Sequence, residues 1–442
     1  MLIDELRHIN PLKIAIINNT GSFSYGEIIS SAYIIQQKIK GLRVGLNIAD
    51  IVQGAKIIIA ADNCAKAVAF LSPSIPIETI KVLIQQFNSD IIVTDHNMFF
   101  EKDDFNALER IDNNVQDSVQ PSQEHTDWVM STSGTTSTPK LVVHSLKSIQ
   151  RTIRKGSIEG SIPIWGLLYD YTRFAGVQVL MQSLLSGATI IQPPESITFE
   201  EQLAFLAKHG CNHLSGTPTM WRKILLSGRA NTLDLQRITL GGEIADNKIL
   251  QMLKLTYPNA KIRHIYASTE AGVGFSVADG KAGFPSSLLT ENNYGVRLKV
   301  AEGRLWVKNE LVENQYLNNN GTVSIDGWID TGDCVSMSGD RFFFLGRESG
   351  VINVGGNKVH PEQIEGVILS HPDVQLARVY EIKNPIVGAL VAADIVLEDE
   401  KPSGFTQELK TFLRSQLERY QVPASITILE NMEISNGGKI KR

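Results

Sequence analysis

The order of apolar patterns along the chain is the feature that most constrains its fold. Short apolar runs that read as strands alternate with segments of helical spacing from residue 14 to about residue 266. This alternation predicts α/β layers, with helices covering the faces of sheets. One such unit has an apolar run at 237–240, a Gly241-Gly242-Glu243 turn and a helix at 247–254. In open α/β sheets, ligands bind at a turn of this kind.

Two early segments are predicted from their apolar content alone. Residues 57–60 read I-I-I-A and are predicted as a strand, because the run is short and rich in β-branched residues. Residues 65–71 are predicted as a helix. Residues 103–126 are polar and acidic without a strong period, so they are predicted as a surface connection.

The last third of the chain has a different pattern. From about residue 294 to 345 the sequence reads as short strands and turns, which predicts a β-rich part. Residues 346–350 read as a linker, and an amphipathic helix follows near 409–420. We therefore predict a large multilayer α/β domain over 1–347, including the β-rich part, and a small α+β domain over 350–442.

Composition excludes several classes of function. The 442 residues are too many for one compact core, and 43% hydrophobic with 20% charged residues is typical of a globular protein in water. A net charge of −5 with scattered Lys and Arg gives no footprint for nucleic acid. Without a signal peptide or an apolar run long enough to span a membrane, the expected location is cytoplasmic.

Cysteine and histidine spacing argues against a metal centre or disulfides. Cys64, Cys211 and Cys334 lie far apart without a C-x-x-C motif, which fits a reducing compartment. His209 and His213 flank Cys211, but no third ligand of suitable spacing follows. Ordinary histidines are the favoured interpretation of this pair.

A loop rich in hydroxyl groups stands at 131–140, with the sequence S-T-S-G-T-T-S-T-P-K. It has neither helical nor strand periodicity, and its hydroxyl and backbone N–H donors around Gly134 suit a polyphosphate. The G-x-x-x-x-G-K-[ST] spacing of the usual phosphate loop is absent. Taken alone, the segment could equally be a Ser/Thr-rich surface turn.

Further motifs follow this loop in a fixed order. After S-T-S-G-T-T-S-T-P-K come G-G-E (241–243), Y-A-S-T-E (266–270), T-G-D (331–333), G-R-E-S-G-V-I-N-V-G-G-N-K-V-H-P-E-Q-I-E (346–365) and N-G-G-K-I-K-R (436–442). This series resembles the adenylate-forming superfamily of acyl- and aryl-CoA synthetases, adenylation domains and firefly luciferase. The resemblance extends over nearly the whole chain, and the order of the motifs makes it specific.

The resemblance implies a reaction in two steps that uses ATP and Mg²⁺. A carboxylate attacks the α-phosphate to give an acyl-adenylate and pyrophosphate. The thiol of CoA, or of a carrier-protein phosphopantetheine, then takes the acyl group. The resemblance also implies a small C-terminal domain that rotates about a hinge. Counting from Gly346-Arg347, this hinge falls at Ser349.

The resemblance assigns the phosphate and metal contacts. Glu270 would hold Mg²⁺, because a hard cation prefers carboxylate oxygen, and Thr269 would donate to the α-phosphate. The loop residues that would cradle the β- and γ-phosphates are Thr132, Ser133, Gly134, Thr135, Thr136 and Lys140.

Nucleotide contacts are assigned in the same way. Tyr266 would stack on adenine, and Asp333 and Arg347 would bind the ribose hydroxyls. Further nucleotide contacts are expected from Gly241, Gly242, Glu243, His264 and Ala267. Taken singly, a Tyr at a strand end could simply pack, and T-G-D could be a tight turn.

Lys439 is the principal catalytic candidate. The lysine of the family's G-K-I motif bridges the attacking carboxylate and the α-phosphate, where charge grows in the transition state. In the other domain pose, Gly355 and Gly356 would line the tunnel for the thiol.

The acid substrate is less well specified. The family's Phe-His-x-x-Gly stretch appears here as residues 168–176, without the His. A mixture of aromatic and small residues favours a flat aromatic or a short-to-medium acyl acid. The candidates for the acyl pocket are Tyr171, Phe174, Ala175, Thr217, Ile265, Gly272 and Val273. Ser137 and Leu141 stand where the family usually has Gly, and Ala267 replaces another.

Three functions are compatible with the sequence. The favoured one is an acid ligase that delivers its acyl group to an acyl carrier protein. The second is an acyl- or aryl-acid:CoA ligase that uses free CoA. The third is an inactive homologue that binds nucleotide, against which the intact Glu270, Asp333, Arg347 and Lys439 argue. The partners expected are thus a small carboxylic acid and either acceptor.

Overall fold

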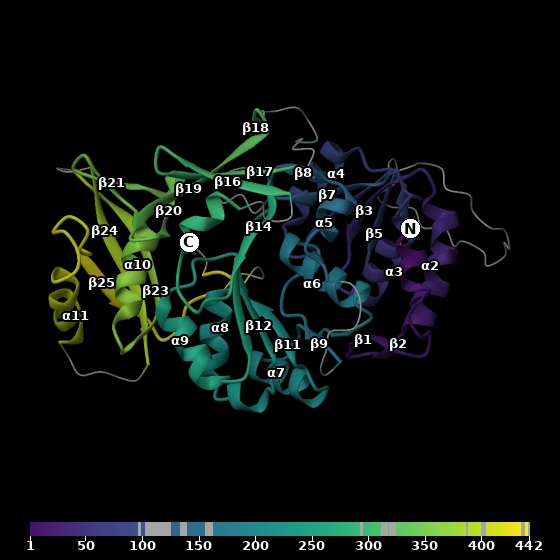
Figure 1. Ribbon diagram of the computed structural model, residues 1–442, viewed down its shortest axis with the longest axis horizontal. Coiled ribbons are helices and arrows are strands. Elements are labelled where there is room, and N and C mark those ends of the chain that lie inside the picture. The colour runs from purple at the N-terminus through teal and green to yellow at the C-terminus, as the bar shows by residue number, and fades with distance from the viewer. Residues whose placement is uncertain are drawn as a thin grey trace.

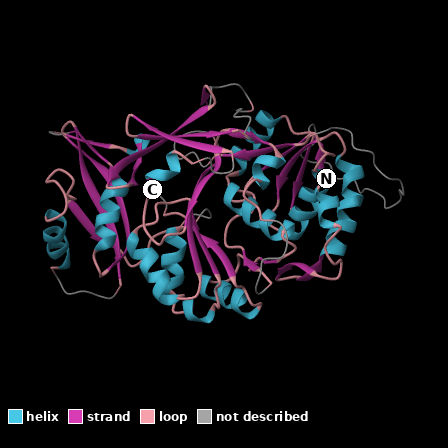
Figure 2. Ribbon diagram, viewed as in Figure 1, coloured by secondary structure: helices cyan, strands magenta, loops and turns pink. Residues whose placement is uncertain are grey.

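The fold was analysed in a computed structural model, shown in Figure 1. It describes residues 1–95, 99–101, 125–132, 139–154, 162–291, 295–310, 317, 324–385, 388–398, 404–434 and 438–440. Helices and sheets are mixed throughout, and a separate sheet lies at the C-terminal end (Figure 2). The predicted α/β class with a small C-terminal sheet domain is confirmed.

The first sheet has eight described strands in the order β14-β13-β12-β11-β9-β10-β1-β2. Its inner strands are parallel, while β2 and β14 run antiparallel at the edges. The strands are β1 (Ile14–Asn18), β2 (Gly21–Ser24), β9 (Ile164–Gly166), β10 (Thr189–Ile191), β11 (His213–Gly216), β12 (Arg237–Gly241), β13 (Lys261–Ser268) and β14 (Gly272–Val277).

The second sheet has six described strands in the order β6-β5-β3-β4-β7-β8. Its centre is again parallel, with β6 and β8 antiparallel at the edges. The strands are β3 (Arg43–Asn47), β4 (Ala67–Phe70), β5 (Ile91–Thr94), β6 (Phe99–Glu101), β7 (Asp127–Ser131) and β8 (Leu141–His144).

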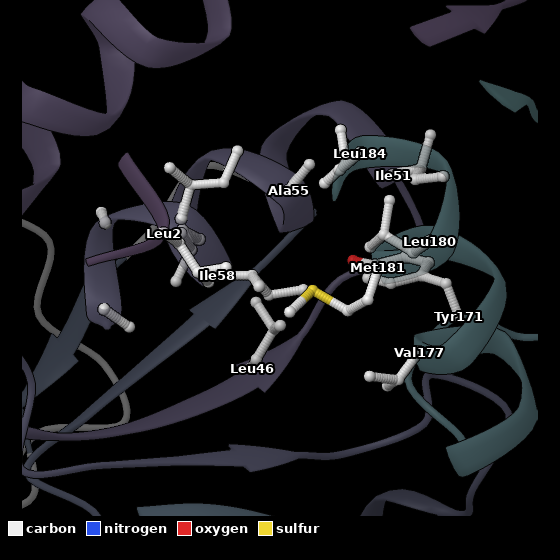
Figure 3. Packing of buried hydrophobic residues seen from close by; sticks show 14 of the residues in the cluster. Leu2, Leu46, Ile51, Ala55, Ile58, Tyr171, Val177, Leu180, Met181 and Leu184 are labelled. Carbon is white, nitrogen blue, oxygen red and sulfur yellow. The ribbon is translucent and has the colours of Figure 1, made fainter. Parts of the chain in front are cut away.

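Helices form layers between and outside these two sheets. Apolar residues of α1 (Leu2–Leu6), α2 (Tyr25–Ile39), α3 (Ile51–Ala61) and α6 (Phe174–Leu185) share one core with strands of both sheets (Figure 3). The helices α7 (Phe199–Lys208), α8 (Pro218–Leu226) and α9 (Asn247–Thr256) bury their apolar faces in a second core with β11 and β12. On the second sheet, α4 (Ile77–Phe87) packs in a separate cluster, and the short α5 (Leu146–Gln150) contacts α6.

Two of the predicted elements are wrong, and they are neighbours. The predicted strand at 57–60 lies inside the helix α3, and the predicted helix at 65–71 contains the strand β4. Nine residues of α3 are buried, and all four of β4 are buried. Both elements lie between layers, so neither shows the one-sided pattern on which a sequence reading relies.

The β-rich part forms an antiparallel sheet in the order β15-β20-β19-β17-β16, with β18 paired to β19. Its core includes the rings of Phe275, Phe284, Phe342 and Phe344. The strands are β15 (Phe284–Pro285), β16 (Val296–Ala301), β17 (Arg304–Asn309), β18 (Ser324–Ile325), β19 (Trp328–Ser338) and β20 (Arg341–Arg347). Single 3-10 turns lie at Ala230–Thr232, Ser286–Leu289 and Glu348–Gly350.

The C-terminal sheet has the order β22-β21-β24-β23, with β25 parallel to β24. It has its own apolar core, to which both helices contribute. The elements are β21 (Ile352–Val354), β22 (Asn357–Val359), α10 (Pro361–Ser370), β23 (Val374–Asn384), β24 (Gly388–Leu397), α11 (Phe405–Arg414) and β25 (Ser425–Ile428). The predicted hinge at Ser349 falls in the 3-10 turn between the two sheets.

In the described ranges, no helix is long and apolar enough to cross a membrane.

Candidate active site

Three neighbouring parallel strands of the first sheet end at one edge and carry the predicted site residues. Thr217 follows β11, the Gly242-Glu243 pair follows β12, and the Thr269-Glu270 pair follows β13. Each strand is in register with the next, so their carboxyl ends lie side by side. In α/β sheets this edge is where ligands bind.

The C-terminal tail of the chain docks on this edge. The Thr217 hydroxyl donates a hydrogen bond to the carbonyl of Gly438. A Cβ placed on Gly242, whose φ is +80°, would lie 3.5 Å from Lys439 Cε and 3.7 Å from Thr217 Cγ2. The fold thus brings Lys439 to the G-G-E turn, although the two are far apart along the chain. In this structure, the tail of the small domain is therefore docked at the G-G-E turn.

Charged groups surround the ammonium group of Lys439. The side chain keeps solvent access, yet protein atoms crowd its charge and this desolvation lowers its pKa, while the carboxylate of Glu243 opposes the shift. Burial raises the pKa of Glu243, which accepts a hydrogen bond of 2.9 Å from the backbone N–H of Thr219. Arg347 and Asp333 also act on the charge of Lys439. The catalytic candidate and the ribose candidates thus share one site.

Asp333 lies between two donors. Its Oδ2 accepts a hydrogen bond of 2.5 Å from the Tyr266 hydroxyl, and its Oδ1 is 3.1 Å from Arg347 Nε. A carboxylate has about four lone-pair positions, so Asp333 can still accept hydrogen bonds from two ribose hydroxyls. The carboxylate side chain is 15% exposed.

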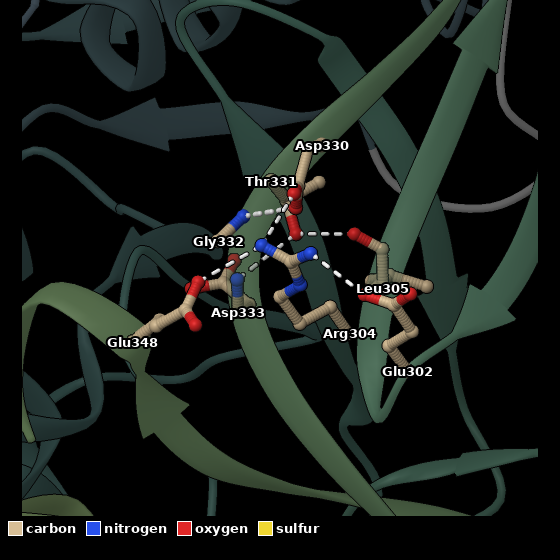
Figure 4. Close-up of polar contacts among 8 residues, drawn as sticks. All are labelled: Glu302, Arg304, Leu305, Asp330, Thr331, Gly332, Asp333 and Glu348. Carbon is tan, nitrogen blue, oxygen red and sulfur yellow. Dashed lines mark hydrogen bonds and ion pairs between the residues drawn. The ribbon is translucent and has the colours of Figure 1, made fainter.

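The turn that carries Asp333 is fixed by polar contacts (Figure 4). The Asp333 backbone N–H donates to Thr331 Oγ1 at 3.1 Å, and the Thr331 hydroxyl donates to the carbonyl of Leu305 at 2.7 Å. Arg304 lies beside this turn, with its Nη1 2.8 Å from Asp330 and 2.9 Å from Glu348. These contacts tie the T-G-D turn to β17 and to the predicted hinge segment.

Tyr266 lies in an aromatic cluster. Its ring stacks with Phe275 at 5.2 Å and with Phe344 at 5.3 Å between centroids. Burial, and then the charge of Asp333, hold its pKa well above the usual value, so the hydroxyl remains a donor. Stacking of Tyr266 on adenine stays a prediction. His264 is turned to the Lys281 carbonyl, 3.0 Å from its Nε2, and burial lowers its pKa.

Only part of the predicted phosphate loop is described. The backbone N–H of Thr132 donates to the Lys140 carbonyl at 2.8 Å, and that of Lys140 donates to Thr132 Oγ1 at 3.0 Å. These bonds close the base of the loop. Ser133, Gly134, Thr135 and Thr136 lie outside the described residues.

Glu270 lies within electrostatic reach of Arg347. Burial alone would lower the pKa of Arg347, but the negative charges of Asp333 and Glu270 contribute to raising it above its usual value. A carboxylate at this strand end suits Mg²⁺, so the donor fits the expected ion. Among the described residues, no cluster of three or more His, Cys, Asp or Glu could hold a metal by itself.

His213 and His209 do not form the metal site considered from their spacing. The His213 ring bonds Asn212 Oδ1 at 2.7 Å and contacts the Trp165 ring edge-on. The His209 ring instead lies against Phe205, 4.6 Å between centroids. Both rings thus pack against aromatic neighbours.

The acyl-pocket candidates are divided by the structure. Thr217 lies at the docked tail, and Phe174 is 9% exposed with its ring 5.6 Å from His144. Val273 on β14 lies opposite Ala267 on β13. The Val273 carbonyl accepts a hydrogen bond from the Arg151 guanidinium. Of the other candidates, Ile265 lies within β13, Gly272 is the first residue of β14, and the exposed Ala175 lies in the first turn of α6.

Tyr171 has most of its contacts in the core, although it also lines a small pocket with Asp170, Gln192 and Glu195. It is 1% exposed, and its hydroxyl donates to the Ile48 carbonyl at 2.7 Å in the core between α3 and α6 (Figure 3). Gly54 on α3 packs so closely on this ring that a side chain there would overlap it. The structure therefore gives the Tyr171 side chain close contacts in the core, and its place in the acyl pocket stays a prediction.

Replacing Tyr171 by Phe tests this assignment. We expect the free energy of unfolding to fall by about 1–3 kcal/mol, because the buried carbonyl of Ile48 loses this donor. The KM for the acid substrate should stay unchanged, as measured beside a urea titration. A raised KM with unchanged stability would instead return Tyr171 to the pocket.

Gly355 and Gly356 form the turn between β21 and β22. Their φ values of +57° and +92° favour glycine, and the Gly356 N–H donates to Asn353 Oδ1 at 2.9 Å. Their predicted place in a thiol tunnel belongs to the other domain pose and stays a prediction.

Sequence reasoning assigned no role to Tyr169 or Arg222, although both lie within electrostatic reach of Glu243. Burial, and then the negative charge of Glu243, raise the pKa of the Tyr169 hydroxyl. The positive charge of Arg173 helps to lower the pKa of Lys439. Arg173 Nε is 3.7 Å from Asp170. Arg222 is buried and paired with Asp246. Apart from the altered 168–176 stretch, no sequence signal pointed to these residues.

Comparison with known families covers most of the chain. The family described as AMP-binding enzyme matches residues 36–316, and the AMP-binding enzyme C-terminal domain matches residues 363–439.

Two curated relatives differ in how much of their length the chain covers. The 2-succinylbenzoate–CoA ligase of Bacillus subtilis (strain 168) is 23% identical over 471 residues, which is 98% of this chain and 95% of that protein. A plipastatin synthase polypeptide of the same strain is 22% identical over 409 residues, 84% of this chain but only 16% of that protein. The chain thus spans about a sixth of the second relative.

Solved structures share the whole fold. An o-succinylbenzoate CoA synthetase from Bacillus subtilis, in complex with its acyl-adenylate intermediate, matches with a TM-score of 0.78 and 19% identity, covering 99% of this chain and 96% of that one. An anthranilate CoA ligase in complex with anthranoyl-AMP matches with a TM-score of 0.81 and 15% identity, covering 99% and 95%. With the family match over residues 36–316, the chain belongs to the AMP-binding enzyme family of the adenylate-forming superfamily and is an AMP-forming ligase of that family.

Proposed function

We propose that this protein is an acid:CoA ligase that activates a small carboxylic acid with ATP and transfers the acyl group to the thiol of CoA. The observation that carries the proposal is the docking of Lys439 at the G-G-E turn, with Glu243, Asp333 and Arg347 around it. An inactive homologue would have no need to hold a cation at this point. ATP and Mg²⁺ as requirements are supported by the related synthetase that was solved with both.

The residues of the site have separate roles in the first step. The substrate carboxylate forms a bond to the α-phosphorus of ATP, and the bond to pyrophosphate breaks. Lys439 would neutralise the charge that grows on the oxygens between these groups. Asp333 and Arg347 would orient the ribose, and Glu270 would hold Mg²⁺ on the phosphates. When bound, the ion would neutralise phosphate charge.

The second step forms a thioester. The thiol sulfur bonds to the acyl carbon, the acyl–phosphate bond breaks, AMP leaves, and the thiol proton passes to solvent. In this step Lys439 has no charge to neutralise on a leaving pyrophosphate, so the tail is free to undock. The predicted rotation of the small domain about Ser349 provides that movement.

CoA is favoured over a carrier protein as the acceptor. The 2-succinylbenzoate–CoA ligase is matched over 95% of its length, whereas the plipastatin synthase polypeptide is matched over only 16% of its length. This reverses the preference for a carrier protein that was drawn from the sequence. Transfer to a carrier-protein phosphopantetheine is the second candidate, supported by the match to that synthase.

The first experiment is an acid panel with separate acceptors. The purified protein, ATP and Mg²⁺ are incubated with aromatic, aryl-dicarboxylic and short-to-medium-chain acids, and pyrophosphate release is measured with hydroxylamine as trap. CoA or a holo carrier protein is then added, and the thioester is identified by mass spectrometry. We expect an acyl-CoA from one class of acid. Thioester on the carrier protein alone would establish the second candidate, and absence of pyrophosphate with every acid would contradict the proposal.

A further inference from the structure

Lys248 connects the two domains away from the active site. Its Nζ is 2.7 Å from the carbonyl oxygen of His371, 3.2 Å from that of Pro372 and 3.1 Å from that of Val374. An ammonium group has three N–H donors, so each donor has an acceptor. Lys248 belongs to α9 of the large domain, and all three carbonyls belong to the small domain (Figure 1).

The position of Lys248 is poor for its own helix and favourable for the other one. It lies in the first turn of α9, just after the N-cap Asp246, where the helix dipole disfavours a cation. Its ammonium group instead reaches the end of α10, whose C-cap is His371. The last carbonyls of a helix lack partners within it and carry the negative end of the dipole. Lys248 therefore caps a helix of the other domain.

Neither side of this contact can shift easily on its own. On α9, Ile249 and Leu250 are buried in the core of the large domain. In the small domain, His371 is 6% exposed and is held edge-on by the rings of Phe405 and Phe412, at 5.3 and 4.9 Å. Rotation of the small domain must therefore break the bonds of Lys248 rather than bend one partner.

The charges that face Lys248 come from both domains. Burial and Arg222 lower its pKa, and the carboxylates of Glu398, Asp246 and Asp373 oppose this. Two of these carboxylates, Glu398 and Asp373, are on the small domain and lie next to each other, joined by a backbone hydrogen bond of 3.0 Å. The surroundings of the cation in the small domain are therefore negative as well as rich in carbonyls.

We propose that Lys248 is a positioning residue that holds the small domain in the pose that docks Lys439, so that it favours adenylate formation and must release before thioester formation. The inference rests on the proposed function. The two contacts are linked through rigid elements, since β23 contacts α8, which carries Met220 against the docked tail. Lys248 acts on the first half-reaction only by fixing where the small domain lies.

Lys248→Met tests the proposal, because it keeps the apolar stem and removes the donors. The matched control is Lys254→Met on the same helix, whose Nζ bonds the Pro258 carbonyl at 2.6 Å within the large domain. Single-turnover pyrophosphate release should fall about tenfold in K248M and stay unchanged in K254M. Thioester formation from pre-formed acyl-adenylate and CoA should be equal to or faster than in the unsubstituted protein. An equal loss in both half-reactions, or in neither, would overturn the proposal.

A distance measurement keeps the test independent of the substrate. Spin labels are placed at Leu255→Cys on α9, where the side chain is 82% exposed, and at Tyr420→Cys on the small domain, 36% exposed. The partly exposed Cys334 is changed to Ser, while Cys64 and Cys211 are buried. We expect one distance in the parent and a second, additional distance in K248M. If no acid is activated, the proposed function fails, but an unchanged distance distribution is still what would refute the role of Lys248.

Discussion

Replacing Lys439 by Ala is expected to slow adenylate formation by about 10²–10³-fold, the range found when one group that stabilises transition-state charge is removed. The reason is the place of this side chain at the Gly242 turn, beside Glu243 and close to Asp333 and Arg347. Binding of ATP should change much less, because the ribose and phosphate contacts expected from Asp333, Arg347 and the 131–140 loop are retained.

The control for this variant is Lys410→Ala. Lys410 is also a lysine of the small domain, and its Nζ donates to the Ala424 carbonyl at 2.7 Å within that domain. Single-turnover pyrophosphate release and thioester formation from pre-formed adenylate are measured for both variants. K439A should lose only the first activity, and K410A neither. If K439A forms adenylate at the parent rate, the docked tail has no catalytic role.

The fold was predictable where elements carry a one-sided or bounded pattern. The strand–turn–helix unit at β12 and α9 was found because a glycine turn separates an apolar run from an amphipathic helix, and the strand and helix lie within two residues of the predicted bounds. The helix α3 and the strand β4 were not predictable in this way, because both are enclosed by other layers. A run such as I-I-I-A then fits a strand or a buried helix equally well, and only tertiary packing decides.

The site was predictable to the extent that its residues end strands. Thr217, Gly242 and Glu270 follow three parallel strands, so the register of the sheet alone brings them to one edge. The docking of Lys439 came from the resemblance, because a lysine near a chain end has no local signal. For Tyr171, alignment with the acyl pocket could not show that its hydroxyl donates to a carbonyl inside the core.

Contacts between the domains could not be derived from sequence spacing. Lys248 meets carbonyls more than 120 residues away, and backbone carbonyls leave no mark in the sequence. The one available hint was a lysine in the first turn of α9, where the helix dipole disfavours it. Such a local conflict is a reason to look for a partner outside the helix.

Replacing Gly438 by Val should slow adenylate formation by about a hundredfold without unfolding the protein. Gly438 has a φ of +74°, and a Cβ there would overlap the buried side chain of Met220 and approach Thr217 Cγ2 to 3.2 Å. The positive φ costs about 1–3 kcal/mol for a residue with a side chain, and overpacking adds about 1–3 kcal/mol. Both terms apply only to the docked tail, so they disfavour this pose rather than the fold.

Gly280→Val is the control that separates the cost of the positive φ from the cost of overpacking. Gly280 has a similar φ of +76°, but a Cβ there would meet nothing within 4 Å. G280V should therefore lower the midpoint of thermal unfolding while both half-reactions keep their rates. G438V should instead keep the unfolding midpoint and lose only adenylate formation, as measured by pyrophosphate release against thioester formation from pre-formed adenylate. Since docking of the tail is what delivers Lys439, G438V and K439A should then fail at the same step for different reasons, one by misplacing the charge and the other by removing it.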